Sequence, residues 1–315
     1  MKQIKYKLNL LKALFFTILL ISTSPLRAEI KVVTTIKPLH SLIANVMDGI
    51  GEPSLIIEDS TSPHSFTLKP SHAKLLEEAD IVFWVGEGIE TFMDRPLESI
   101  VKNAEVVEFM EIESINKLKF REESIFDDHD DHDDHDDHSG HDDHGHAHGE
   151  FDAHIWLDPV NAKEMVLEIA HELSHLDPAN EDKYNANAET TNLALDEMID
   201  DISQNINKDA KFVVFHDAYQ YFEERFGVRA AGALTLNTDV LPGAKQISDI
   251  QDVINDKGIN CIFSEPQFNP KIISTIAEDT NIKTGVFDPL GANIESNKQL
   301  YFELINDLSQ SLKDC

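Results

Sequence analysis

Three histidines and one aspartate in this sequence have the residue types that a borderline metal ion such as Zn²⁺ binds. They are His64, His154, His216 and Asp288. Three of them follow a short apolar run that predicts a strand, whereas His154 lies in the apolar segment DAHIWLDP. Because ligands of open parallel sheets bind beyond the carboxyl ends of the strands, we expect these four side chains to meet. Three imidazoles and one carboxylate would form a tetrahedral zinc site with bonds of about 2.0 to 2.2 Å.

Other interpretations of these histidines remain open, because no local spacing forces the four residues together. A single histidine among apolar neighbours, such as His154, is more often a core residue than a ligand. His40 and His72 lie on predicted helices without a partner pattern, and we interpret both as structural or surface residues.

A tract of Asp and His between residues 127 and 150 is a second candidate for metal binding. It carries eleven of the 58 acidic residues and no Lys or Arg. Its histidines, eight of the 15 in the chain, are His129, His132, His135, His138, His141, His144, His146 and His148. Clustered imidazoles and carboxylates favour weak capture of metal at several sites, although a solubilising linker is the alternative. Having almost no apolar residue, the tract is predicted to be a disordered surface loop.

The segment HELSH, His171 to His175, matches the H-E-x-x-H signature of zinc proteases. In a helix, however, both histidines share a face with Glu164 and Glu168, which is the expected solvent face. A zinc hydrolase is therefore the least favoured alternative. The sequence also contains no G-x-x-x-x-G-K-[ST] loop, so it does not bind ATP by that route.

The elements that must position these residues alternate between strands and helices, which predicts an α/β fold with mainly parallel sheets. Strands are predicted at residues 31–35, 54–58, 81–86, 104–109, 211–215, 228–234, 261–265 and 282–287. Helices are predicted at residues 38–48, 71–79, 161–176, 217–226, 244–257, 270–279 and 297–312. Between the two halves, Asp177 and Pro178 open a predicted helix that runs to about Asn207, which we interpret as a rigid connector.

This pattern predicts two similar lobes with a cleft between them. The expected segments are a signal peptide at 1–28, an N-terminal lobe at 29–176, a linker helix at 177–207 and a C-terminal lobe at 208–315. The Asp/His tract at 127–150 would be an insertion in the first lobe.

The first residues predict export from the cytoplasm. Four lysines precede the apolar run ALFFTILLI, which is too short to span a bilayer, and Ala28 offers a cleavage point. No cysteine lies near that point, so no lipid anchor is expected. In an exported protein the two cysteines, Cys261 and Cys315, suggest one disulfide, with two buried thiols as the alternative. The net charge of −32 argues against nucleic acid or an anionic membrane as a partner.

Several segments together resemble the metal-binding cluster of periplasmic substrate-binding proteins, and most closely the zinc-uptake binding proteins of ABC transporters. They are TTIKPLHSLI, PHSFTLKPS, ADIVFWVG, DAHIWLDP, VVFHDAYQYFEERFG, SEPQF and FDPLG. The resemblance covers nearly all of the mature chain and includes the Asp/His tract and the two cysteines. It implies two α/β lobes joined by a long helix, with metal buried between them.

The resemblance also implies which residues bind the metal. The matching motifs place ligands at His64, His154 and His216, and a fourth at Asp288, although some zinc-binding members leave this position to water or another carboxylate. Manganese-binding relatives are similar but carry a carboxylate where His216 stands. The histidine at this position therefore favours zinc.

The function implied is a monomeric zinc receptor of the Gram-negative periplasm. It would perform no chemistry and would deliver Zn²⁺, its transported ligand, to an inner-membrane ABC permease with a separate ATPase subunit. An extracellular zinc buffer or an adhesin-type protein without a permease is the alternative. A zinc hydrolase that uses HELSH is a third possibility.

Overall fold

The computed structural model describes residues 30–126, 150–236, 238, 242–280, 282–313 and 315. The predicted signal peptide lies outside the described residues, as does the Asp/His tract up to residue 149. Within these described ranges, no helix is long and apolar enough to cross a membrane.

The first lobe is built on a four-stranded parallel sheet with the order β2-β1-β3-β4. Its strands are β1 (Val32–Thr34), β2 (Ser54–Leu55), β3 (Ile81–Trp84) and β4 (Glu105–Glu108). Its helices are α2 (Lys37–Val46), α3 (Pro70–Glu78) and α4 (Asp94–Ser99). The two inner strands are buried along their whole length, as expected for apolar runs in a sheet covered on both faces.

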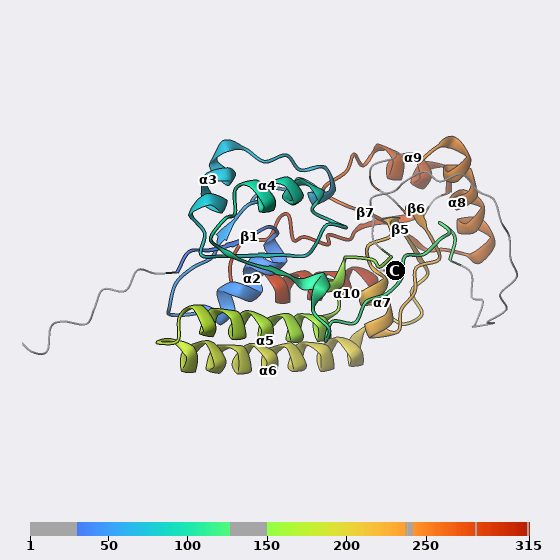
Figure 1. The fold of residues 1–315 in the computed structure, drawn as a ribbon. Coiled ribbons are helices and arrows are strands. Elements are labelled where there is room, and N and C mark those ends of the chain that lie inside the picture. The colour runs from blue at the N-terminus through green and yellow to red at the C-terminus, as the bar shows by residue number, and fades with distance from the viewer. Residues whose placement is uncertain (1–29, 127–149, 237, 239–241, 281, 314) are drawn as a thin grey trace, which may run out of the picture.

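The second lobe repeats this topology with the order β6-β5-β7-β8, again with parallel pairing only. Its strands are β5 (Phe212–His216), β6 (Ala233–Thr235), β7 (Cys261–Ser264) and β8 (Lys283–Val286). Its helices are α7 (Gln220–Phe226), α8 (Ala244–Lys257), α9 (Lys271–Thr280) and α10 (Leu300–Lys313). The predicted class, an α/β fold of two similar lobes with parallel sheets, is confirmed. Figure 1 shows the first lobe at the left and α8 and α9 of the second at the right.

Two long helices, α5 (Pro159–Leu176) and α6 (Glu181–Asn205), run side by side beneath the first lobe (Figure 1). The predicted start of α6 at Pro178 is wrong. Asp177 instead ends α5, because its backbone N–H donates to Leu173 O at 2.8 Å. Its carboxylate accepts from the Asn180 side chain at 2.6 Å, and α6 begins only after this turn. With 25 residues α6 is about 37 Å long.

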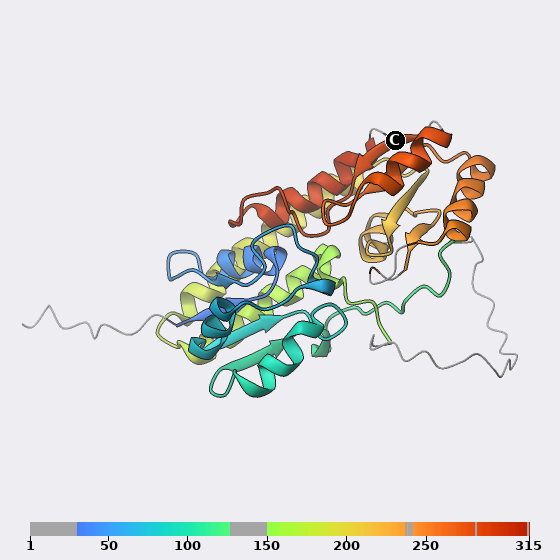
Figure 2. The same ribbon diagram turned by 90° about the horizontal axis from the view of Figure 1, so that it is seen from above.

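One apolar core extends through both lobes. It joins buried side chains of both sheets to those of α5, α6 and α10, and includes Phe83, Trp156, Phe212 and Tyr301. Although α10 follows the strands of the second lobe, it begins against α2 of the first lobe and ends in the second, and Figure 2 shows it extending between them. A smaller core covers the other face of the second sheet, around Ile262. The cysteines Cys261 and Cys315 form the predicted disulfide.

Short turns complete the connections, and four of those in the described part of the chain are 3-10 helices. They are η1 (Pro63–Ser65), η2 (Thr91–Met93), η3 (Phe109–Glu111) and η4 (Ile155–Leu157). The chain before the Asp/His tract crosses from the first lobe to the second, where Ile125 pairs with Gly232 beside β6. After the tract, Phe151 pairs back with Lys119, so the chain returns from β6 to the segment that leads into η4.

Candidate metal site

His64 comes from the first lobe, in the connection between β2 and α3. It is the middle residue of η1, whose first residue, Pro63, has the backbone angle that a helical turn needs. Its side chain is half-buried and lines the same cavity as His154 and His216. The sequence thus places an imidazole just beyond the carboxyl end of an edge strand.

His154 stands directly before η4 and is held by a buried carboxylate. Its ring Nδ1 lies 2.6 Å from Asp152 Oδ1, and its backbone N–H donates to the same oxygen at 2.9 Å. Because an ionised carboxylate can only accept, Nδ1 carries the proton and Nε2 presents its lone pair. Asp152 in turn accepts from Gln220 Nε2 at 2.6 Å, and its backbone carbonyl accepts from Tyr221 at 2.6 Å. Helix α7 of the second lobe therefore fixes the orientation of His154.

His216 is the last residue of β5 and has the same kind of partner. Its Nδ1 lies 2.6 Å from Oε1 of Glu265, which directly follows the neighbouring strand β7. Both side chains are buried. Burial lowers the pKa of His216, but the Glu265 carboxylate outweighs it, so that this pKa is raised above its usual value. The ring again directs Nε2 away from its carboxylate.

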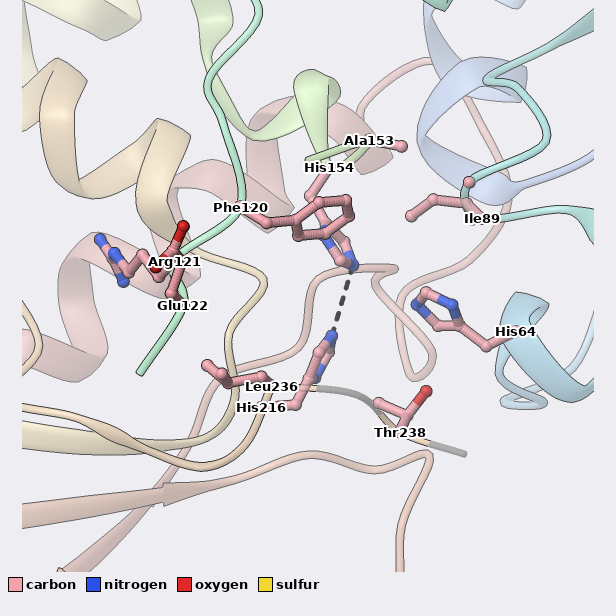
Figure 3. A pocket seen from close by; sticks show the side chains of 11 residues that line it. His64, Ile89, Phe120, Arg121, Glu122, Ala153, His154, His216, Leu236 and Thr238 are labelled. Atoms are coloured by element: carbon pink, nitrogen blue, oxygen red, sulfur yellow. Dashed lines mark hydrogen bonds between the residues drawn. The ribbon is translucent and has the colours of Figure 1, made fainter. Parts of the chain in front are cut away.

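The three imidazoles point toward one another in a cavity of about 350 Å³ (Figure 3). The Nε2 atoms of His154 and His216 are 3.3 Å apart. The ring centroid of His64 lies 5.6 Å from that of His154 and 6.0 Å from that of His216. One nitrogen of each ring lies within 4.8 Å of the others. Two nitrogens bound tetrahedrally to one zinc ion lie about 3.3 Å apart, so this spacing suits a shared ion.

The structure does not bring Asp288 into this group. Its Oδ1 accepts from Gln267 Nε2 at 2.9 Å and from Leu290 N at 3.1 Å, while Oδ2 accepts from Ala292 N at 2.6 Å. These hydrogen bonds close the turn after β8 and use both carboxylate oxygens. Asp288 therefore stays a predicted ligand, and it is held in this turn apart from the three imidazoles.

Asp152 and Glu265 were not among the residues predicted from the sequence. A signal for each was present. Glu265 is the last residue of the predicted strand 261–265, close to where His216 and Asp288 follow their strands, and Asp152 opens the DAHIWLDP segment. A third missed residue is Arg121, which lines the cavity. Its guanidinium donates to Asp217 and Glu223 at 2.7 Å each and thereby ties the crossing segment to α7. Despite this arginine, burial raises the pKa of Asp217 to about 7.

The remaining histidines occupy other places. His40 Nε2 lies 3.2 Å from Pro53 O, and His72 Nδ1 accepts from Lys69 N at 3.2 Å, so both have the structural roles expected of them. His171 and His175 lie on α5 with side chains 74% and 73% exposed, which agrees with the predicted solvent face of HELSH. The eight histidines of the Asp/His tract lie outside the described residues.

Comparison with known proteins agrees with this architecture. The family model described as zinc-uptake complex component A, periplasmic (ZnuA), matches residues 32–315. The high-affinity zinc uptake system protein ZnuA of Brucella abortus is 44% identical over 303 residues, which cover 90% of this chain and 91% of that protein. The chain belongs to this family. The corresponding protein of Yersinia pestis is 33% identical, with 91% and 92% of the two chains covered. Members are transport receptors rather than enzymes, so HELSH is not a protease site.

Solved structures support the fold. A crystal structure of ZnuA superposes with a TM-score of 0.72 at 21% identity and covers 90% of this chain and 98% of that one. The substrate-binding protein FpvC of Pseudomonas aeruginosa, in complex with Mn²⁺, gives 0.74 at 21% identity, with 91% and 99% covered. At these identities the likeness concerns the fold alone.

Proposed function

We propose that this protein is a periplasmic receptor that captures Zn²⁺ between its two lobes and delivers it to an inner-membrane ABC permease. Zinc is the cargo, and the permease and its ATPase are separate chains. The family description and the names of the relatives support zinc uptake as the process. The exported location rests on the signal-like start of the sequence and on the word periplasmic in that description.

One observation carries the proposal. Two Nε2 atoms, on His154 and His216, face each other at 3.3 Å, and each ring has its other nitrogen against a buried carboxylate. Two neutral imidazoles in this tautomer turn lone pairs toward the same point, an arrangement that a shared cation stabilises. His64 supplies a third nitrogen to that point.

We assign His64, His154 and His216 as zinc ligands, with the fourth position filled by Asp288 or by water. Three imidazoles favour zinc over manganese, which prefers oxygen ligands. His216→Glu or His216→Asp should therefore shift the preference from Zn²⁺ toward Mn²⁺.

Calorimetric titration of single variants in a background without residues 127–149 tests this assignment. His64→Ala, His154→Ala or His216→Ala should each weaken zinc binding beyond the roughly 10- to 100-fold that outer partners contribute, because water can only partly replace an imidazole. Any two together should abolish tight binding, and Asp288→Ala should do least. Affinity should also weaken as the pH falls, beginning above about 6.5, because each ligand must be neutral and the pKa of His216 is raised above its usual value.

His171→Ala is the matched control, because this exposed histidine is not one of the proposed ligands of the cleft. If it removes the tight site while His154→Ala keeps it, the assignment fails. Delivery needs a separate test: a strain lacking the gene should grow poorly on scarce zinc, and the His154→Ala, His216→Ala double variant should not restore growth. Normal growth of the deletion strain would instead favour a zinc buffer or an adhesin.

A further inference from the structure

The helix that carries HELSH presents a second group of metal-binding side chains on the outside of the first lobe. Glu172 and His175 lie one turn apart on α5, and Glu105 begins β4, one of the two edge strands of the first sheet. His175 Nδ1 lies 3.6 Å from Glu105 Oε1, and one ligand atom of each residue lies within 4.8 Å of the others. From the start of α5 at Pro159, beside His154, His175 is about 24 Å along the helix. The two groups of ligands are therefore separate.

Negative charge gathers around this second group. The hollow between β4 and α5 is lined by six glutamates and three apolar residues: Glu105, Glu108, Glu111, Glu113, Glu168, Glu172, Val106, Val107 and Ile112. No lysine or arginine belongs to this lining. The ion pairs that the described structure gives Glu105 and Glu172 involve histidines alone. A cation held here would relieve the repulsion between these carboxylates.

The donor atoms select the class of cation. A purely carboxylate group would suit Mg²⁺ or Ca²⁺, whereas an added imidazole shifts the preference toward Zn²⁺ and its neighbours. Glu and His three residues apart on one helix project from the same face, a spacing that helical metal proteins use to bind one ion. Glu105, from a strand rather than the helix, faces this pair.

We propose that Glu105, Glu172 and His175 form a second, weaker site for zinc-class divalent cations on the outer face of the first lobe. The site is weaker than the cleft because its side chains are 38%, 23% and 73% exposed, so water competes for the ion and completes its coordination. It shares no ligand with the cleft, so its failure would leave the proposed zinc receptor intact. It also gives HELSH a role, through Glu172 and His175 instead of a His–His pair.

Chemical footprinting of the full mature protein tests this site directly. Diethyl pyrocarbonate modifies exposed neutral imidazoles, and mass spectrometry of the same peptide reports His171 and His175 separately. Their side chains are almost equally exposed, so His171 is an internal control. With the cleft already loaded, excess Zn²⁺ at ten times its dissociation constant should slow modification of His175 about tenfold and leave His171 nearly unchanged. Mg²⁺ at the same concentration should protect neither.

The variants Glu105→Gln and Glu172→Gln complete the test. Each keeps its side-chain shape at the surface, so folding is preserved, and each should weaken the protection of His175 by zinc. The proposal is overturned if His175 reacts as fast as His171 at every zinc concentration, if zinc protects both equally, or if protection survives in the double variant.

Discussion

At the scale of single residues, the cleft depends on pairs in which a buried carboxylate stands behind an imidazole. Asp152 and Glu265 each lie 2.6 Å from the Nδ1 of a histidine and are nearly inaccessible to solvent. Buried carboxylates are costly unless they are paired, so these two favour a cation within the same site. Two carboxylates and three neutral imidazoles would match the charge of one divalent ion.

Glu265→Gln tests the contribution of this charge. The glutamine oxygen can still accept from His216 Nδ1, so the orientation of the ring is kept while the negative charge is lost. Zinc affinity should fall about 10- to 100-fold, as for other outer partners of metal-binding histidines, while unfolding of the metal-free protein should change little. Competition titration against a chelator and denaturant unfolding measure the two effects. An unchanged zinc affinity would mean that Glu265 only orients the ring.

The sequence predicted the imidazoles of the site better than their partners. Each of His64 and His216 was found from its place after a predicted strand, since strand ends of a parallel sheet gather at one edge. Asp152 and Glu265 were missed because they contact the far side of each ring, a relation that only the folded chain shows. For Asp288 the turn that uses both of its oxygens could not be foreseen from FDPLG.

At the scale of secondary structure, the alternation of strands and helices was predicted almost throughout. Apolar runs overlap each of the eight strands in the described ranges, although β2 is only two residues long and β6 shares only two residues with the predicted strand 228–234. The short α4 was not predicted, because its six residues bury no side chain and therefore carry no periodic apolar signal. The start of α6 was misjudged because Asp177 and Pro178 are also suited to ending α5.

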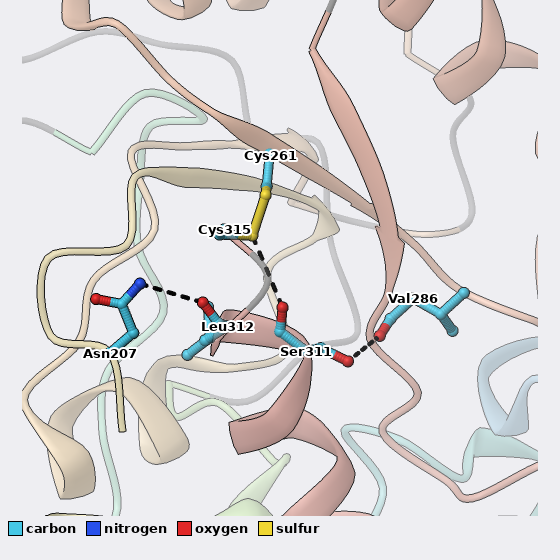
Figure 4. The surroundings of a disulfide bond; sticks show 6 residues. All are labelled: Asn207, Cys261, Val286, Ser311, Leu312 and Cys315. Atoms are coloured by element: carbon cyan, nitrogen blue, oxygen red, sulfur yellow. Dashed lines mark hydrogen bonds between the residues drawn. A yellow bond between two sulfur atoms is a disulfide. The ribbon is translucent and has the colours of Figure 1, made fainter. Parts of the chain in front are cut away.

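The disulfide joins two such elements and should stabilise the second lobe without affecting the metal. Cys261 begins β7 and Cys315 follows α10, at a sequence separation of 54 and with 5.7 Å between their Cα atoms (Figure 4). In the chain-entropy model such a link contributes about 4 kcal/mol. The Cys261→Ser, Cys315→Ser double variant should lose about this much in urea unfolding and keep its zinc affinity within about twofold, because neither cysteine lines the cleft.

Figure 4 also shows two hydrogen bonds that hold the end of α10 without the disulfide, from Asn207 to Leu312 O and from Ser311 to Val286 O. Some order at the C-terminus should therefore remain in the double variant. Free thiols in the freshly exported protein, or a large loss of zinc affinity on removing them, would contradict this account.

At the scale of the whole molecule, the two lobes are joined by a shared apolar core and by hydrogen bonds as well as by the predicted connector helix. The predicted connector α6 packs along α5 and contacts α2 and α10, and one apolar core runs through both lobes. The turn after β8, residues 287–294, is held from the first lobe by Trp156, whose indole N–H donates to Pro289 O at 2.8 Å. Amphipathic spacing predicted these helices individually but could not show which faces would meet. We expect the lobes to move little relative to each other when zinc binds.

Lys37 makes three hydrogen bonds between the lobes and gives the last prediction. It is the first residue of α2 and is buried, and its ammonium donates to the carbonyls of Ala292 at 2.9 Å, Ile294 at 3.1 Å and Gly291 at 3.4 Å. Burial lowers its pKa, which the nearby Asp288 carboxylate partly offsets. Lys37→Met would leave these carbonyls without their donor and should cost about 2 to 3 kcal/mol of unfolding free energy. Because the same turn carries Asp288, zinc should also dissociate faster in stopped-flow release to a chelator.

Lys298→Met is the control, since its exposed pair with Asp48 at 2.6 Å should contribute less than about 1 kcal/mol. Equal unfolding free energies and equal release rates in the two variants would show that Lys37 does not hold this turn.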